Sequence, residues 1–166
     1  MMICTAATKS SVYEALLPIH KAAYGDKVIT ITFPKMRWGE GTKIKPQAIL
    51  QAFSVDPVVF WMDADCTVDL PSEPPPGEWD ICLIDNVHPH HINRISSAFI
   101  LFRDTPNTRM FLSTWEQNNK QMKKDHPALT KTINQLRTTV HFIDGTAWLK
   151  DRHVINALLP NRGRYE

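Results

Sequence analysis

The sequence lacks a long apolar run. In 166 residues, no stretch approaches the 18 consecutive apolar residues that indicate a membrane-spanning helix. The N-terminus has no basic residue ahead of its short apolar run, so we expect no signal peptide. Cysteine is scarce, and Cys4, Cys66 and Cys82 lack metal-ligand spacing. We therefore expect buried, reduced thiols, no membrane span and a cytoplasmic location.

Neither sign of charge is in large excess. The chain has 19 Lys and Arg against 17 Asp and Glu, which gives a net charge of +2. So small a positive charge permits an anionic substrate but does not by itself indicate a nucleic-acid partner. Internal repeats and low-complexity tracts are also missing. The length and the hydrophobic content of 43% predict one globular domain over residues 1–166.

Strand-like and helix-like segments alternate along the first part of the chain. The first helix is expected to begin at Ser10 or Ser11 and to bury Val12, Ala15, Leu16, Ile19 and Ala23. Asp125 is expected to cap a helix over residues 127–136. Strands are predicted at 2–8, 28–33, 57–62, 81–84, 96–102 and 140–143, and helices at 10–23, 47–53, 107–123 and 127–136. This order predicts an α/β fold with a mostly parallel central sheet.

An apolar run from Pro57 to Met62 is followed directly by two carboxylates, Asp63 and Asp65. The run is short and rich in valine and aromatic residues, which indicates a buried strand. If the strand continues through Asp65, the carboxylates point to one side at its carboxyl end, where open α/β sheets bind ligands. Two carboxylates this close favour a hard divalent cation between them, and such a cation also binds phosphate.

The arrangement of these motifs resembles the nucleotide-sugar glycosyltransferases of the GT-A fold. Trp38-Gly39 and Lys45-Pro46-Gln47-Ala48-Ile49 precede the Asp63-Ala64-Asp65 strand, as a loop lysine and a helix do in such families. Later in the chain, Asp125-His126-Pro127-Ala128-Leu129 is similar to the Asp-Gln pair that opens a family helix. The resemblance covers roughly residues 2–137 and implies a single-domain α/β/α sandwich.

The resemblance implies an enzyme that transfers a sugar from a nucleotide-sugar donor, expected to be a UDP-sugar, to an acceptor hydroxyl. Mn²⁺ or Mg²⁺ would stabilise the leaving diphosphate, and the acceptor would be a glycan or a modified nucleic-acid base. The implied metal ligands are Asp65 and Asp63, with Asn156 or His153 near the place of the family's late histidine. The implied donor-binding residues are Thr5, Ala6, Trp38, Lys45, Asp63 and Ala64. For an inverting transfer, Asp125 is the first candidate base and Asp85 the second.

Two other functions fit parts of the pattern. Asp63-Ala64-Asp65-Cys66-Thr67 is similar to the motif of haloacid dehalogenase phosphatases, in which Asp63 would be the nucleophile. Against this, two predicted strands precede the motif, and a late acidic pair is missing. A non-catalytic domain that binds sugar nucleotides is the other alternative. The chain is about half as long as expected for a transferase of this family.

Overall fold

The structure is a computed structural model that describes residues 1–85 and 95–149, and the backbone of residues 154–156. It is an α/β protein in which short 3₁₀ helices lie at Glu14–Leu16, Gly25–Lys27 and Thr42–Ile44. The remaining elements are β1 (Met2–Thr8), α1 (Leu17–Tyr24), β2 (Val28–Phe33), α2 (Trp38–Gly41), α3 (Lys45–Ala52), β3 (Val58–Met62), β4 (Cys66–Val68), β5 (Ile81–Asp85), β6 (Ile95–Arg103), α4 (Pro106–Gln121), α5 (Asp125–Leu136), β7 (Phe142–Asp144) and β8 (Val154–Asn156).

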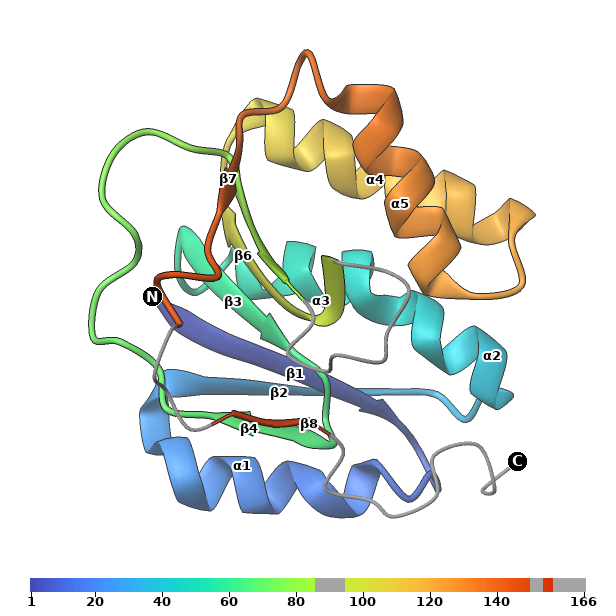
Figure 1. The fold of residues 1–166 in the computed structure, drawn as a ribbon. Helices are drawn as coiled ribbons and strands as arrows, with labels where there is room; N and C mark the ends of the chain where they lie inside the picture. The colour runs from blue at the N-terminus through green and yellow to red at the C-terminus, as the bar shows by residue number, and fades with distance from the viewer. Residues whose placement is uncertain (86–94, 150–153, 157–166) are drawn as a thin grey trace.

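Six strands form the central sheet in the order β2-β1-β3-β6-β5-β7 (Figure 1). β1 pairs in parallel with both β2 and β3, and β5 pairs in parallel with β7. β6 runs antiparallel to its neighbours β3 and β5. The expected mostly parallel sheet is therefore confirmed, with β1 and β2 preceding the strand that leads into Asp63. A separate antiparallel pair joins β4 to β8.

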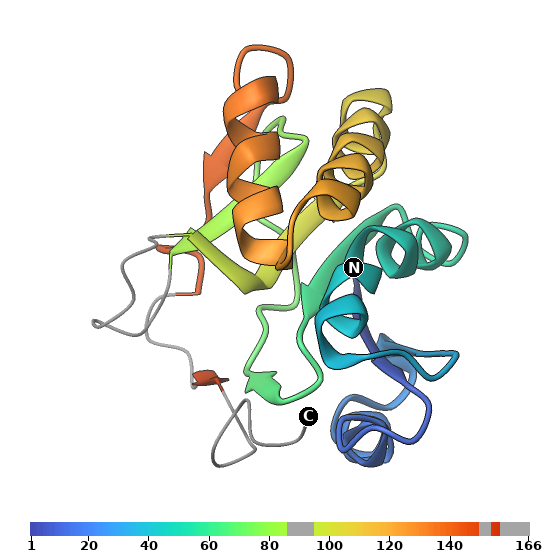
Figure 2. The same cartoon turned by 90° about the vertical axis from the view of Figure 1, so that its right-hand side faces the viewer.

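The two faces of the sheet bury different clusters of side chains. Helices α3, α4 and α5 cover one face, as Figures 1 and 2 show. The core on that face includes Trp61, Ile100 and Phe102 from the sheet and Ile49, Phe111, Trp115 and Leu129 from the helices. The opposite core includes Ile3, Phe60, Met62 and Phe99, packed with residues of β4, Trp79 and Tyr24 of α1. With both faces covered, ligands can approach the sheet only at its edges or at the ends of its strands.

The first helix differs from its prediction. It begins at Leu17 after a 3₁₀ turn, with Pro18 in its first turn, where proline is well tolerated. Of the predicted buried face, Leu16 is confirmed, but the rest was wrong, because Val12, Ala15, Ile19 and Ala23 are exposed while Leu17 and His20 are buried. Periodicity counted from Ser10 therefore had the wrong register. His20 is accommodated in the interior because its Nε2 lies 2.7 Å from the backbone oxygen of Ala64.

Other differences lie close to the carboxylates. β3 ends at Met62, and residues 63–66 form a turn closed by a hydrogen bond from the Cys66 amide to the Asp63 oxygen. The strand alternation assumed for Asp63 and Asp65 was therefore wrong. Asp125 is the first residue of α5 rather than its N-cap, which is Lys124. In the described part of the chain, none of the helices is long and apolar enough to cross a membrane.

Candidate active site

A pocket of about 710 Å³ opens at the carboxyl ends of β1 and β3. Its wall comes from the end of β1 and the segment that follows it, the loop after β2, the 3₁₀ turn and the start of α3, the end of β3 and the turn after it, Ser97 of β6, and the start of α5. The chain thus brings together six segments in one pocket. The crevice beyond the carboxyl ends of strands is where open α/β sheets place their ligands.

A buried lysine lies at the centre of this pocket. The Nζ atom of Lys45 lies 2.9 Å from Asp63 Oδ1 and 2.8 Å from Asp125 Oδ2, and it donates to the Ser97 backbone oxygen at 2.9 Å. Asp63 Oδ1 also accepts a hydrogen bond from Trp61 Nε1 at 2.9 Å. An ammonium group has three hydrogens, and here three oxygens surround it. Lys45 therefore joins the two carboxylates and has no hydrogen left for a phosphate.

Electrostatics in this cluster favour a charged lysine. Burial alone would lower the pKa of Lys45, but the charges of Asp125 and Asp63 outweigh it and raise that pKa. For Asp63, burial raises the pKa, Lys45 opposes the rise, and the charges of Asp125 and Asp65 add to it. One cation faces two carboxylates, so the cluster has an excess of negative charge.

Asp65 lies apart from Lys45, in the turn that follows β3. It lines the same pocket, is 3% exposed, and accepts a hydrogen bond from Cys66 Sγ at 3.6 Å. The contact between His20 and the Ala64 oxygen holds this turn against α1. The backbone pairing of Cys66 with Asn156 places β8 one residue away from Asp65. The late segment expected to contribute to a metal site is thus adjacent to the turn.

The structure places the remaining predicted site residues unevenly. Ala6 and Ala64 line the pocket, whereas Thr5 is fully buried and does not. Asp85 is exposed at the end of β5 and is outside the pocket lining. The backbones of Trp38 and Asn156 belong to α2 and β8, but their side chains lie outside what the structure describes. His153 also lies outside the described residues.

Several residues of the pocket were not predicted from the sequence. They include four cationic side chains on its wall, the apolar side chains of Val12 and Met36, and the hydroxyl-bearing Tyr13. Trp61 and His20 were also missed as residues that fix the carboxylate turn. A signal existed for Trp61, because it precedes Asp63 by two positions and thus shares its side of an extended chain. Lys9, Lys35, Arg37 and Lys124 are the four cations.

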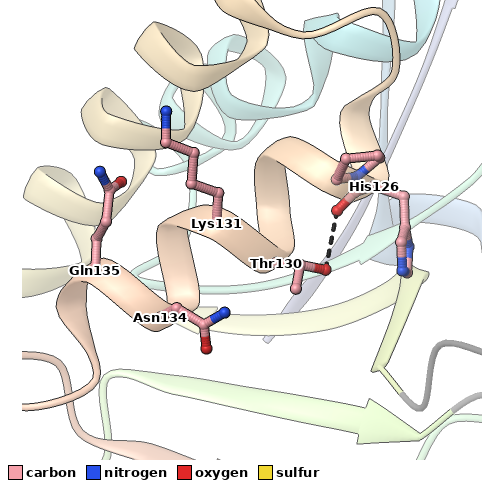
Figure 3. A pocket seen from close by; sticks show the side chains of 6 residues that line it. His126, Thr130, Lys131, Asn134 and Gln135 are labelled. Carbon is pink, nitrogen blue, oxygen red and sulfur yellow. Dashed lines mark hydrogen bonds between the residues drawn. The ribbon is translucent and has the colours of Figure 1, made fainter.

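A second hollow, of about 600 Å³, lies along α5 (Figure 3). It is lined by one helix, and several of its polar groups already have partners within the protein. Thr130 donates to the His126 backbone oxygen at 3.2 Å, Lys131 to Gln121 at 3.1 Å, and Gln135 accepts from Asn118 at 2.8 Å. The lining residues are His126, Pro127, Thr130, Lys131, Asn134 and Gln135. This hollow therefore offers fewer unsatisfied groups to a ligand than the first pocket.

The donor set at the carboxylates suits a cation that is shared with a ligand. Among the described residues, no group of three or more His, Cys, Asp and Glu side chains is placed to hold a metal. Asp65 lines the pocket and Asp63 has one oxygen, Oδ2, that is not bound to Lys45. Carboxylate oxygens fit Mg²⁺ or Mn²⁺, ions that commonly complete their coordination with phosphate and water.

Comparison with solved structures identifies the fold class. No protein-family profile matches the chain, and a search of curated proteins found no significant match. A glycosyltransferase involved in the glycosylation of the major capsid of PBCV-1 has a TM-score of 0.62 at 12% identity, over 88% of this chain and 82% of that one. At that identity the likeness establishes the fold, and this chain has a GT-A-like glycosyltransferase fold.

A weaker likeness connects the chain with a bacterial protein. Glycosyltransferase GlyE of Streptococcus pneumoniae TIGR4 has a TM-score of 0.47 at 12% identity, and this chain spans 45% of its length. The apo form of GlyE gives the same score at 10% identity.

Proposed function

We propose that the chain is a glycosyltransferase that moves a sugar from a nucleotide-sugar donor to an acceptor hydroxyl with the help of Mn²⁺ or Mg²⁺. The observation that carries this proposal is the convergence of Asp63, Asp65, Asp125 and Lys45 in one pocket. The pocket lies at the strand ends of a fold shared with a solved glycosyltransferase. A UDP-sugar is the first donor to test, and glycans and modified nucleic-acid bases are the first acceptors. We further propose a cytoplasmic setting, where buried cysteines such as Cys4, Cys66 and Cys82 remain thiols.

Each charged residue has a distinct role in this proposal. Asp65 would hold the metal, assisted by Asp63 and, from β8 and the segment before it, by Asn156 or His153. The metal would supply positive charge for the departing nucleoside diphosphate. Lys45 would act as a positioning residue, because it fixes one oxygen of Asp63 and one of Asp125.

Asp125 is a better placed candidate base than Asp85, because only Asp125 lines the pocket. Its Oδ2 atom is held by Lys45, which leaves Oδ1 as the oxygen that can accept a proton from an acceptor hydroxyl. The side chain is 11% exposed, so an acceptor can reach it only from within the pocket. An inverting transfer would use Asp125 in this way, and a retaining transfer would need it only to orient the acceptor.

The test is release of nucleoside diphosphate from a panel of sugar nucleotides, with Mn²⁺, with Mg²⁺ and with EDTA. We expect metal-stimulated release that Asp65→Asn lowers by about 100-fold or more, since it removes charge stabilisation at the leaving group. Asp26→Asn is the matched control, because Asp26 is fully exposed and, among the described residues, pairs with Lys21 alone. Hydrolysis of p-nitrophenyl phosphate that Asp63→Asn abolishes, without release from sugar nucleotides, would instead support the phosphatase alternative.

A further inference from the structure

Four cationic side chains on the pocket wall have no charged partner among the described residues. Lys9 follows β1, Lys35 and Arg37 belong to the loop after β2, and Lys124 precedes α5. All four are exposed, and none of their side chains makes an ion pair or hydrogen bond with another described residue. They come from three separate segments, so their gathering around one pocket is a product of the fold. We call them the cationic rim.

Some cations elsewhere on the described surface have partners: Lys21 pairs with Asp26, Lys43 with Glu40, and Arg109 with Asp104. Others, such as Lys27 and Arg137, are exposed and make no ion pair with another described residue. The rim is distinguished by the gathering of its four cations around one pocket. Within the pocket, Lys45 is already matched by two carboxylates. The lining as a whole holds five cationic side chains and three carboxylates, which leaves two positive charges. A ligand with two negative charges would neutralise them.

The same pocket also exposes apolar side chains. Val12 is 37% exposed and Met36 is 38% exposed, and both lie on the wall. They are two of the five large hydrophobic residues that are most exposed in the described part of the chain. An apolar wall beside a cationic rim suits a ligand that combines a flat, weakly polar group with a dianion. A sugar nucleotide has both parts, since its base is flat and its diphosphate diester carries two negative charges.

We propose that the cationic rim, and not a metal ion, supplies most of the attraction for the donor's diphosphate, so that the nucleotide binds without a divalent cation. This inference rests on the proposed function and adds that one set of groups binds the donor while another assists the transfer. Lys9, Lys35, Arg37 and Lys124 hold the diphosphate, and Asp65 would hold a metal that stabilises the leaving group in the transfer step. Because Lys45 contacts one oxygen of Asp63, the metal would bind more tightly once the nucleotide is in place.

Calorimetric titration of the whole chain with UDP, GDP, CDP and ADP tests this inference. Each titration is made in EDTA and again in Mn²⁺, and the nucleoside of the best ligand serves as the phosphate-free probe. We expect binding in EDTA that weakens as salt is raised, because exposed charges are screened. Arg37→Ala and Lys124→Ala should each weaken the diphosphate by about tenfold, as expected for loss of a hydrogen bond to a charged group. The nucleoside should be unaffected by either substitution.

Lys21→Ala is the matched control, since it removes one positive charge outside the pocket and should not change binding. Nucleotide binding in Mn²⁺ but not in EDTA would overturn this inference and leave the proposed transferase intact. Equal effects of Lys21→Ala and Arg37→Ala would also overturn it, because the rim would then act only through net charge. Failure of all four nucleotides to bind in either condition would overturn both the inference and the proposed function.

Discussion

Replacement of Lys45 by methionine tests the ion cluster on which the site is built. The substitution keeps most of the side-chain volume but removes the ammonium group between Asp63 and Asp125. Those two carboxylates are only 23% and 11% exposed, so water can compensate them only partly. Removing one partner of a buried ion pair costs about 3–5 kcal/mol. We expect Lys45→Met to lower the free energy of unfolding by that amount at pH 7.

Urea unfolding followed by far-UV circular dichroism is the assay, because Lys45 lies 5.8 Å from the Trp61 ring and would disturb fluorescence directly. Lys21→Met is the matched control at a surface ion pair, where the expected cost is below about 1 kcal/mol. Adding Asp125→Asn to Lys45→Met should recover part of the loss by removing one unpaired buried charge. The reasoning is refuted if Lys45→Met costs no more than Lys21→Met, or if the second substitution adds a further loss.

The pKa of Lys45 fixes how this contribution depends on pH. Burial would lower the pKa, but the charges of Asp125 and Asp63 raise it above the ordinary lysine value. A group whose pKa is raised on folding stabilises the protein fully below its unfolded pKa. We therefore expect the cost of Lys45→Met to remain through neutral pH and to shrink only as the pH rises above the ordinary lysine range.

Three further predictions concern the interior of the protein. For Asp80, burial raises the pKa, but hydrogen bonds from Thr105, the His141 amide and Asn107 lower it below the ordinary value. The stability that Asp80 contributes is therefore lost as the pH falls through its folded pKa. Between pH 7 and pH 3, the urea midpoint of unfolding should thus fall less for Asp80→Asn than for the wild type. Gly145→Ala would place a methyl group against Cys82 Sγ, and we expect the free energy of unfolding in a urea titration to fall by about 1–3 kcal/mol. No measurable loss would show that Cys82 moves aside without cost. Burial raises the thiol pKa of Cys4 and of Cys82 to about 12, and Cys66 is also buried. A disulfide reagent should therefore label these three thiols only after unfolding. Rapid labelling of the native protein would contradict their burial.

Much of the fold was predictable because its strands are short apolar runs with clear ends. β1 and β2 have the predicted bounds, and β3 ends where the carboxylates begin. The start and end of a strand depend on neighbouring residues, so the sequence alone can predict them. The first helix failed for a local reason too, since the 3₁₀ turn before Leu17 shifted the register of its buried face.

The site was less predictable, because its contacts join residues that are far apart in the chain. Lys45, Asp63 and Asp125 were all expected to act there, yet Lys45 was expected to bind the donor and not to pair with the two carboxylates. Its contact with Asp125 joins residues 80 positions apart, and hydrophobic periodicity cannot predict a contact over such a separation in the sequence. The cationic rim was missed for a similar reason. An unpaired surface lysine looks like any other in a sequence, and only the fold shows that Lys9, Lys35, Arg37 and Lys124 surround one pocket.

Hydrogen–deuterium exchange with and without a saturating nucleotide sugar most directly tests the claim that this pocket is the donor site. We predict slower exchange in residues 6–13, 35–45 and 61–65 and at the start of α5, the segments that form the pocket wall. Residues 127–135 lie along the second hollow. Those of them beyond the first turn of α5 should exchange at the same rate with and without the nucleotide sugar. Protection confined to residues 127–135, with none at residues 61–65, would contradict the assignment.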